Sequence, residues 1–180
     1  AETPEAAAES ARYFRALGER VCAWLDQAGH PFCPGDIMAR NPAWCAALPD
    51  WKRNVSDWIR RAEPREVLAF HIFLDFRPVH GDASLARELR RHIGTALEEN
   101  PAFLPFLARD LLRFEPQPGW LARLLHPGRD ARAWQVDLKA AMMPIAGFAR
   151  LYALRHGLEE THTLDRLEAL AGRGLITLND

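Results

Sequence analysis

Transfer of a phosphoryl or nucleotidyl group with a metal needs at least two carboxylates that share Mg²⁺ ions, commonly as Asp-x-Asp. The 180-residue sequence lacks this arrangement, because no two of its acidic residues are separated by a single position. A Gly-Ser dipeptide, a GxxxxGK[ST] phosphate loop, HExxH and GxSxG are also absent. We therefore predict no catalytic residue and no metal-binding residue in this chain, and we do not expect catalysis from the chain alone.

The first of three polar segments that could do other chemistry runs from Asp75 to Asp82. Asp75 lies on a predicted helix that is otherwise apolar, so it needs a partner if it is buried, and Arg77 could supply one. Asp82 suits the cap of the following helix. Two interpretations stay open: an ion pair and cap that join two helices at a turn, or a ligand or domain-interface site.

The second polar segment holds Asp137 and Lys139, followed by Pro144. Lys139 is one of only two lysines beside 21 arginines, which weakly suggests that a compact ammonium group is required at this position. A helix that begins at Pro144 would offer free backbone N–H groups to an anion. The alternative is a solvated lysine before the start of a helix.

The third polar segment pairs Arg150 and Arg155 with the run from Thr163 to Leu167. Arg166 is expected in the first turn of its helix, where a cation opposes the helix dipole and Asp165 is better placed. An arginine in an unfavourable position sometimes marks a site, and the alternative is a salt bridge between helices. A basic helix face is formed by Arg87, Arg90, Arg91 and His92. This face is either a solvated surface or a patch for another domain.

The elements that position these residues are predicted to be helices, covering about 4–28, 44–62, 64–76, 82–99, 100–114, 144–157 and 163–171. We expect the third to be central and buried on all sides. The proline-rich stretch 30–42 predicts a loop that can hold a short edge strand at 36–39, and the turn-rich stretch 115–132 allows one short helix at 120–125. The predicted fold class is all-α, a helical bundle with a small irregular N-terminal piece.

Composition sets limits on function. A net charge of −1 and a pI near 6.7 provide no bulk attraction to nucleic acid or to an anionic membrane, so any anion site must be local. The longest apolar run, 67–74, is too short to span a bilayer. Cys22, Cys33 and Cys45 fit neither a disulfide framework nor a zinc site. We therefore expect a soluble, cytoplasmic protein with reduced thiols.

Several stretches together resemble one bacterial family. They include Cys33-Pro34-Gly35-Asp36, Phe73-Leu74-Asp75-Phe76-Arg77-Pro78-Val79-His80-Gly81-Asp82, Asp137-Leu138-Lys139 and Thr163-Leu164-Asp165-Arg166-Leu167. The chain is similar to the nucleotidyltransferases of bacterial signal-transduction proteins, which resemble the PII-protein uridylyltransferases. Residues 1–43 resemble the tail of the nucleotidyltransferase domain, and residues 44–180 resemble the helical substrate-binding domain, which we expect to continue after Asp180.

This resemblance implies a function and a set of site residues. In the intact enzyme, Mg²⁺ and a nucleoside triphosphate would serve transfer of a nucleotidyl group to a protein or a small acceptor. The catalytic domain would precede Ala1 in the same polypeptide, with cyclic-nucleotide-binding and CBS domains upstream. Lys139 and Arg150 would contact nucleotide phosphates or the acceptor, and Asp75 and Arg77 would hold the corner at the cleft. The matching motifs also select Asp82, Asp137 and Arg166. The alternative is a non-catalytic helical interaction module.

Overall fold

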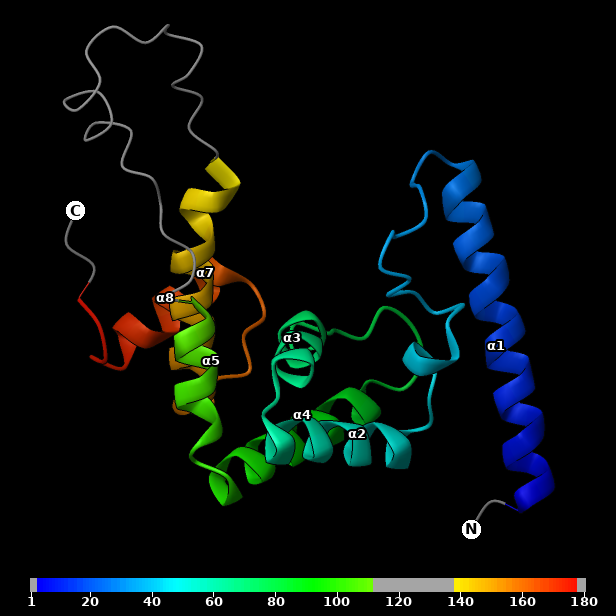
Figure 1. Ribbon diagram of the computed structural model, residues 1–180, viewed down its shortest axis with the longest axis horizontal. Coiled ribbons are helices and arrows are strands. Elements are labelled where there is room, and N and C mark those ends of the chain that lie inside the picture. Colours follow the sequence, from blue (N-terminus) through cyan, green and yellow to red (C-terminus); the bar gives the residue numbers. More distant parts are fainter. Residues whose placement is uncertain (1–2, 112–137, 178–180) are drawn as a thin grey trace, which may run out of the picture. The chain divides into compact units, whose positions relative to one another are not determined.

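The computed structural model describes residues 3–111 and 138–177, and all regular secondary structure within these ranges is helical (Figure 1). This confirms the all-α prediction. The chain divides into two compact units, Ala1–Asn54 and Val55–Asp180, with the boundary inside helix α2 (Leu48–Arg61).

Helix α1 (Pro4–Gln27) dominates the first unit and follows the predicted limits closely. The Thr3 side chain accepts a hydrogen bond from the Ala6 N–H, and Pro4 occupies the first helical position, where its missing N–H costs nothing. Gly18 and Cys22 are the buried residues of α1. Five apolar residues at helical spacing form an exposed stripe on α1: Tyr13, Leu17, Val21, Trp24 and Leu25.

The prediction of a short edge strand at residues 36–39 was wrong, because this segment forms turns. Asp36 has a φ of 50°, which takes it out of the extended region. Its N–H donates to the Cys33 carbonyl at 2.9 Å, and its own carbonyl accepts from the Asn41 side chain at 3.0 Å. Arg40 Nε then pairs with the Asp36 carboxylate at 2.9 Å. Local side-chain bonds therefore replace the strand ladder.

The helix predicted at 44–62 is divided in two. A 3-10 turn, η1 (Pro42–Trp44), is capped by the Asn41 side chain, which accepts from the Ala43 N–H at 3.0 Å. Cys45 then leaves the helical region, with φ −127° and ψ 83°. α2 begins only at Leu48, with Pro49 in its first turn, where proline is tolerated.

The second unit contains the rest of α2 with α3 (Pro64–Phe73), α4 (Ala83–Glu99), α5 (Phe103–Leu111), α7 (Leu138–Arg155) and α8 (Thr163–Gly172) (Figure 1). Helix α7 packs against both α5 and α8. Phe70 of α3 and Phe103 of α5 meet edge to face, with ring centroids 5.0 Å apart. The largest fully buried side chains of this unit are Phe70, Phe103, Ile59, Leu107, Leu170 and Val55.

Helix α3 differs from its prediction in two ways. It ends at Phe73 instead of near Phe76, and it is not buried on all sides, because Leu68 and Ile72 are 56% and 42% exposed. Its buried side carries Val67, Phe70 and, just past the end, Leu74. The early end places Asp75 in the turn that follows the helix, and Asp82 caps α4 as predicted.

The predicted helix start at Pro144 was also wrong. Pro144 lies inside α7, six residues after the helix begins at Leu138, so its position offers no cluster of free N–H groups to an anion. In α8 the cap is His162, and Thr163 is the first helical residue. The short helix expected at 120–125, and the last residues of the helix expected at 100–114, lie outside the described residues. No helix in the described ranges has the length and apolarity needed to cross a membrane.

A single methyl group tests the packing of the first unit. In Gly18→Ala the new Cβ would collide with the backbone carbonyl oxygen of Ala39, which cannot move aside as a flexible side chain could. We expect a loss of about 1–3 kcal/mol in the free energy of unfolding. The matched control is Gly94→Ala, in the interior of α4, where nothing lies within 4 Å of the new Cβ. We expect that variant to gain up to about 1 kcal/mol. Urea unfolding followed by circular dichroism measures both, and an undiminished stability of Gly18→Ala would contradict this packing.

Candidate functional site

Asp75 joins three parts of the second unit through its two carboxylate oxygens. Oδ2 accepts from Nη2 of Arg150 on α7 at 2.5 Å, and Oδ1 accepts from Nη2 of Arg166 on α8. These partners lie 75 and 91 positions away in the sequence. We call these three residues the Asp75 cluster. Its closest contacts are charge-assisted hydrogen bonds, which are stronger than neutral ones.

Arg166 is the most deeply buried charged residue of the described part of the chain, with 3% of its surface exposed. Its Nε donates to the Glu160 carbonyl at 2.7 Å, in the loop between α7 and α8. The charge in the first turn of α8 therefore opposes the helix dipole but gains a carboxylate and a carbonyl in return. The salt bridge, one of the two interpretations of Arg166, is thus present, although it joins α8 to the turn after α3 and not to another helix.

Arg150 is held less completely than Arg166. Its side chain is 21% exposed, and its Nε is buried without a hydrogen-bond partner among the described residues. Asp75, 31% exposed, compensates two guanidinium groups with one carboxylate. The cluster therefore carries an excess of positive charge in a half-buried place, where charge is weakly screened.

The pKa of Asp75 reports the balance of these interactions. Burial raises the pKa, but hydrogen bonds from Arg166 and Arg150, with the attraction of the same two charges, outweigh that effect and hold it below the ordinary 3.8. The carboxylate therefore stays ionised at neutral pH. Its contribution to stability is complete above pH 3.8 and is lost as the pH falls below that value.

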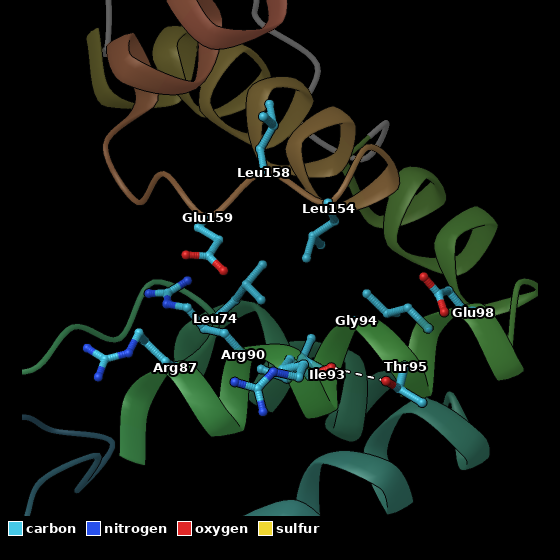
Figure 2. A pocket seen from close by; sticks show the side chains of 13 residues that line it. Leu74, Arg87, Arg90, Ile93, Gly94, Thr95, Glu98, Leu154, Leu158 and Glu159 are labelled. Atoms are coloured by element: carbon cyan, nitrogen blue, oxygen red, sulfur yellow. Dashed lines mark hydrogen bonds between the residues drawn. The ribbon is translucent and has the colours of Figure 1, made fainter. Parts of the chain in front are cut away.

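Arg90 on α4 lies between the Asp75 cluster and the surface. It donates to the Phe76 carbonyl, and its guanidinium lies 4.6 Å from the centre of the Phe76 ring. Burial lowers the pKa of Arg90 below the ordinary value of an arginine, the nearby Glu159 carboxylate acts in the opposite direction, and Arg166 lowers it further. Arg90 remains protonated at neutral pH, and its side chain is directed toward Glu159 (Figure 2).

A hollow of about 330 Å³ opens beside Arg90, between α4 and the end of α7 with the loop that follows (Figure 2). We call it the α4–α7 hollow. Three arginines from α4 line it together with two glutamates and four leucines, which come from the turn after α3, from α4, from α7 and from the loop after α7. The lining residues include Arg87, Arg90, Arg91, Leu74, Leu154, Leu158, Glu98 and Glu159.

The sequence shapes this hollow through the end of α7. Gly157 adopts a φ of 63°, and the N–H groups of Gly157 and Leu158 donate to the carbonyls of Leu154 and Ala153 at 3.2 and 2.8 Å. This is a Schellman motif, in which glycine is favoured because glycine tolerates positive φ. The motif stops α7 where the sequence predicted and turns Leu158 and Glu159 over the hollow.

The structure brings only some of the predicted site residues together. Asp75, Arg150 and Arg166 meet, but Arg77, proposed as the partner of Asp75, is exposed, and Asp75 pairs with the other two arginines. Asp82 caps α4: its carboxylate accepts from the N–H and Oγ of Ser84 at 2.8 and 2.7 Å, which lowers its pKa.

The second predicted segment is only partly covered. Asp137 lies outside the described residues, and of Lys139 only the helical backbone is described. Lys139 and Arg150 share α7 but are eleven positions apart. At 1.5 Å per residue, the helix separates their backbones by about 16 Å.

Sequence reasoning selected Arg87, Arg90 and Arg91 only as a helix face and did not predict the hollow. The signal that could have found it is Gly157, since a glycine stop predicts that the chain turns back there. Metal chemistry has no support in the described ranges, because no three His, Cys, Asp or Glu residues come together in them. The donors present do not fit Mg²⁺, so we derive no step of transfer through a metal here.

The Asp75 cluster can be tested by removing its single negative charge. Asp75→Asn keeps the shape of the side chain but leaves Arg150 and Arg166 without a counter-ion. Breaking a buried pair costs about 3–5 kcal/mol, and partial exposure of Asp75 reduces this to about 2–3 kcal/mol. Since the pKa of Asp75 is lowered on folding, the difference between variant and parent should be constant above pH 3.8 and shrink below it. Urea unfolding at a series of pH values measures both effects.

The matched control is Asp165→Asn on α8. Asp165 is 63% exposed and lies 3.6 Å from His162 Nδ1, so we expect a change of less than about 0.5 kcal/mol. Equal effects of the two substitutions at neutral pH would contradict the importance of the Asp75 cluster.

Two family models match the chain. Residues 2–65 match "Putative nucleotidyltransferase DUF294", and residues 101–180 match "Putative nucleotidyltransferase substrate binding domain". The comparisons with curated proteins and with solved structures each gave no match. The second matched range includes Arg150 and Arg166, and neither range includes Asp75 or the arginines of α4. The chain is therefore similar, in this order, to a nucleotidyltransferase domain and to the substrate-binding domain that accompanies it.

Proposed function

We propose that the helical part of this chain is the accessory substrate-binding domain of a metal-dependent nucleotidyltransferase. In this proposal it positions a nucleoside triphosphate or an acceptor for a catalytic domain in the same polypeptide, and it does no chemistry itself. The catalytic domain would supply the Mg²⁺ site and the nucleotidyl transfer. Cyclic-nucleotide-binding and CBS domains remain proposed regulatory neighbours, and we propose a cytoplasmic location.

The observation that carries this proposal is the α4–α7 hollow, which is lined by both arginines and leucines. Substrate sites in proteins are typically concave and mostly apolar, with a few polar groups that orient the ligand. Arg87 and Arg91 are exposed and can meet an anion from solvent, whereas Arg90 is half-buried between the hollow and the Asp75 cluster. Arginine suits this task because its planar fork binds carboxylate or phosphate through two hydrogen bonds.

The predicted site residues take two roles in this proposal. Asp75, Arg150 and Arg166 are positioning residues, because they hold the turn after α3, α7 and α8 around the hollow. Four further residues keep the roles that the resemblance implies: Lys139, Asp137, Arg77 and Asp82. These roles are contact with the phosphates or the acceptor, or support of the corner beside the cleft.

A second candidate function is a non-catalytic interaction module. It is favoured by the exposed apolar stripe of α1, because large exposed apolar patches commonly mark contacts with other proteins. The two functions differ in where a ligand binds: the hollow of the second unit, or α1 of the first.

Amide resonances mapped by NMR test the proposed function. We titrate the chain with Mg-ATP, with Mg-UTP and with a short peptide that alternates glutamate and leucine. Binding of at least one substrate class should shift the amides of residues 87–98 and 154–159, with no pyrophosphate released from either nucleotide. Arg87→Gln combined with Arg91→Gln should weaken this binding about tenfold, a loss of about 1.4 kcal/mol.

The control for these titrations is Arg65→Gln, an exposed arginine in the first turn of α3 that does not line the hollow. This variant should bind like the parent chain. Perturbations confined to α1 would favour the interaction module, and absence of binding by all three probes would contradict the proposed function.

A further inference from the structure

The charge behind the α4–α7 hollow is poorly balanced. Three half-buried or buried arginines, Arg90, Arg150 and Arg166, share two carboxylates. Asp75 pairs with Arg150 and Arg166, and the exposed Glu159 acts on Arg90 more strongly than Asp75 does. Arg166 and Arg90 repel each other, and burial penalises the charge on Arg90. Another negative group placed against Arg90 in the hollow would relieve this imbalance.

The lining of the hollow limits what can carry that negative group. Leu154 of α7 and Leu74 of the turn after α3 point into the hollow, whereas the side chain of Leu158, which also lines it, points away from the arginines (Figure 2). No aromatic side chain occurs among the described residues that line the hollow, so a nucleobase would find no ring on which to stack. Leucines instead offer contact area to aliphatic groups.

The hollow is also unsuited to a highly charged anion. It lies beside the C-terminal end of α7, where the helix dipole is negative, and not at a helix N-terminus. Glu98 and Glu159 add two carboxylates to the lining. A triphosphate would meet these negative groups, whereas one or two carboxylates could pair with Arg90, Arg87 and Arg91 while avoiding them.

We propose that the α4–α7 hollow binds an acidic, aliphatic peptide segment of a protein acceptor: a carboxylate pairs with Arg90 and the exposed arginines, and a leucine-like side chain lies against Leu74 and Leu154. This inference rests on the proposed function and deepens it, because it assigns the hollow to the acceptor and not to the nucleotide. An exposed glutamate or aspartate beside an apolar residue would be the recognition element on that acceptor.

Fluorescence anisotropy tests this assignment with a fluorescein-labelled peptide that alternates glutamate and leucine. Three matched probes accompany it: a peptide that alternates glutamine and leucine, one that alternates glutamate and serine, and inorganic tripolyphosphate as competitor. We expect the glutamate–leucine peptide to bind at least about fivefold more tightly than either altered peptide, and tripolyphosphate to compete poorly.

Two substitutions in the chain locate the site. Arg87→Gln with Arg91→Gln should weaken binding of the glutamate–leucine peptide at least about fivefold, and Leu154→Ser, at a half-buried position on α7, should weaken it as well. Arg65→Gln should leave it unchanged. Circular dichroism checks that each variant is folded before it is used.

The outcomes separate this inference from the proposed function. Equal binding of all peptides, or binding that ignores both hollow variants, would overturn the inference. Displacement by tripolyphosphate or Mg-UTP at the same arginines, with no peptide binding, would also overturn it but would leave the proposed function standing with the nucleotide as ligand. Binding of neither probe class would overturn both.

Discussion

A single carboxylate governs the arrangement of the second unit. Asp75 lies in the turn after α3, and each of its oxygens accepts from an arginine of a different helix, Arg150 of α7 and Arg166 of α8. Arg166 is almost completely buried, so its charge depends on Asp75 and on the Glu160 carbonyl for compensation. Removing one member of such a group leaves a charge buried without a partner, which costs far more than the intact group contributes as net stability. The cluster therefore specifies which turn must meet which helices.

The geometry of the α4–α7 hollow follows from the same constraint. The turn that carries Asp75 also carries Leu74 and Phe76, and the Phe76 carbonyl and ring hold Arg90 of α4. Arg150 fixes α7 close to this turn, and the Schellman motif at Gly157 then directs Leu158 and Glu159 over the opening. The walls of the hollow are thus held by polar contacts, while its floor is aliphatic. Such a combination suits a ligand that has both a charge and an apolar part.

Sequence reasoning predicted what depends on local signals. Proline at the start of α1 and α3, Asp82 before α4 and Gly157 after α7 mark helix ends that the structure confirms, because each residue acts on its own few neighbours. It failed where a local signal competes with its surroundings. Pro144 is compatible with a helix start, yet α7 continues through it, and the 36–39 segment satisfies its backbone with the Asn41 side chain instead of a strand.

The sequence predicted which residues belong to the candidate site better than it predicted which of them pair. Asp75 was recognised as a carboxylate that needs a partner, but Arg77 was chosen because it is near in sequence, whereas the partners lie 75 and 91 positions away. Periodicity within one helix cannot identify contacts over such distances, since they depend on how helices pack. The hollow was missed for the same reason: its arginines lie on α4, most of its leucines come from other segments, and the arginines alone resemble an ordinary solvated helix face.

A double-mutant cycle on Asp75 and Arg166 tests this account most directly. The free energy of unfolding is measured for the parent chain, Asp75→Asn, Arg166→Met and the double variant. If the carboxylate and the guanidinium stabilise the unit together, the double variant loses much less than the sum of the two single losses, with a coupling energy of about 2 kcal/mol. Single losses that add to within about 0.3 kcal/mol would show that the two residues act independently, and would contradict the central role of Asp75.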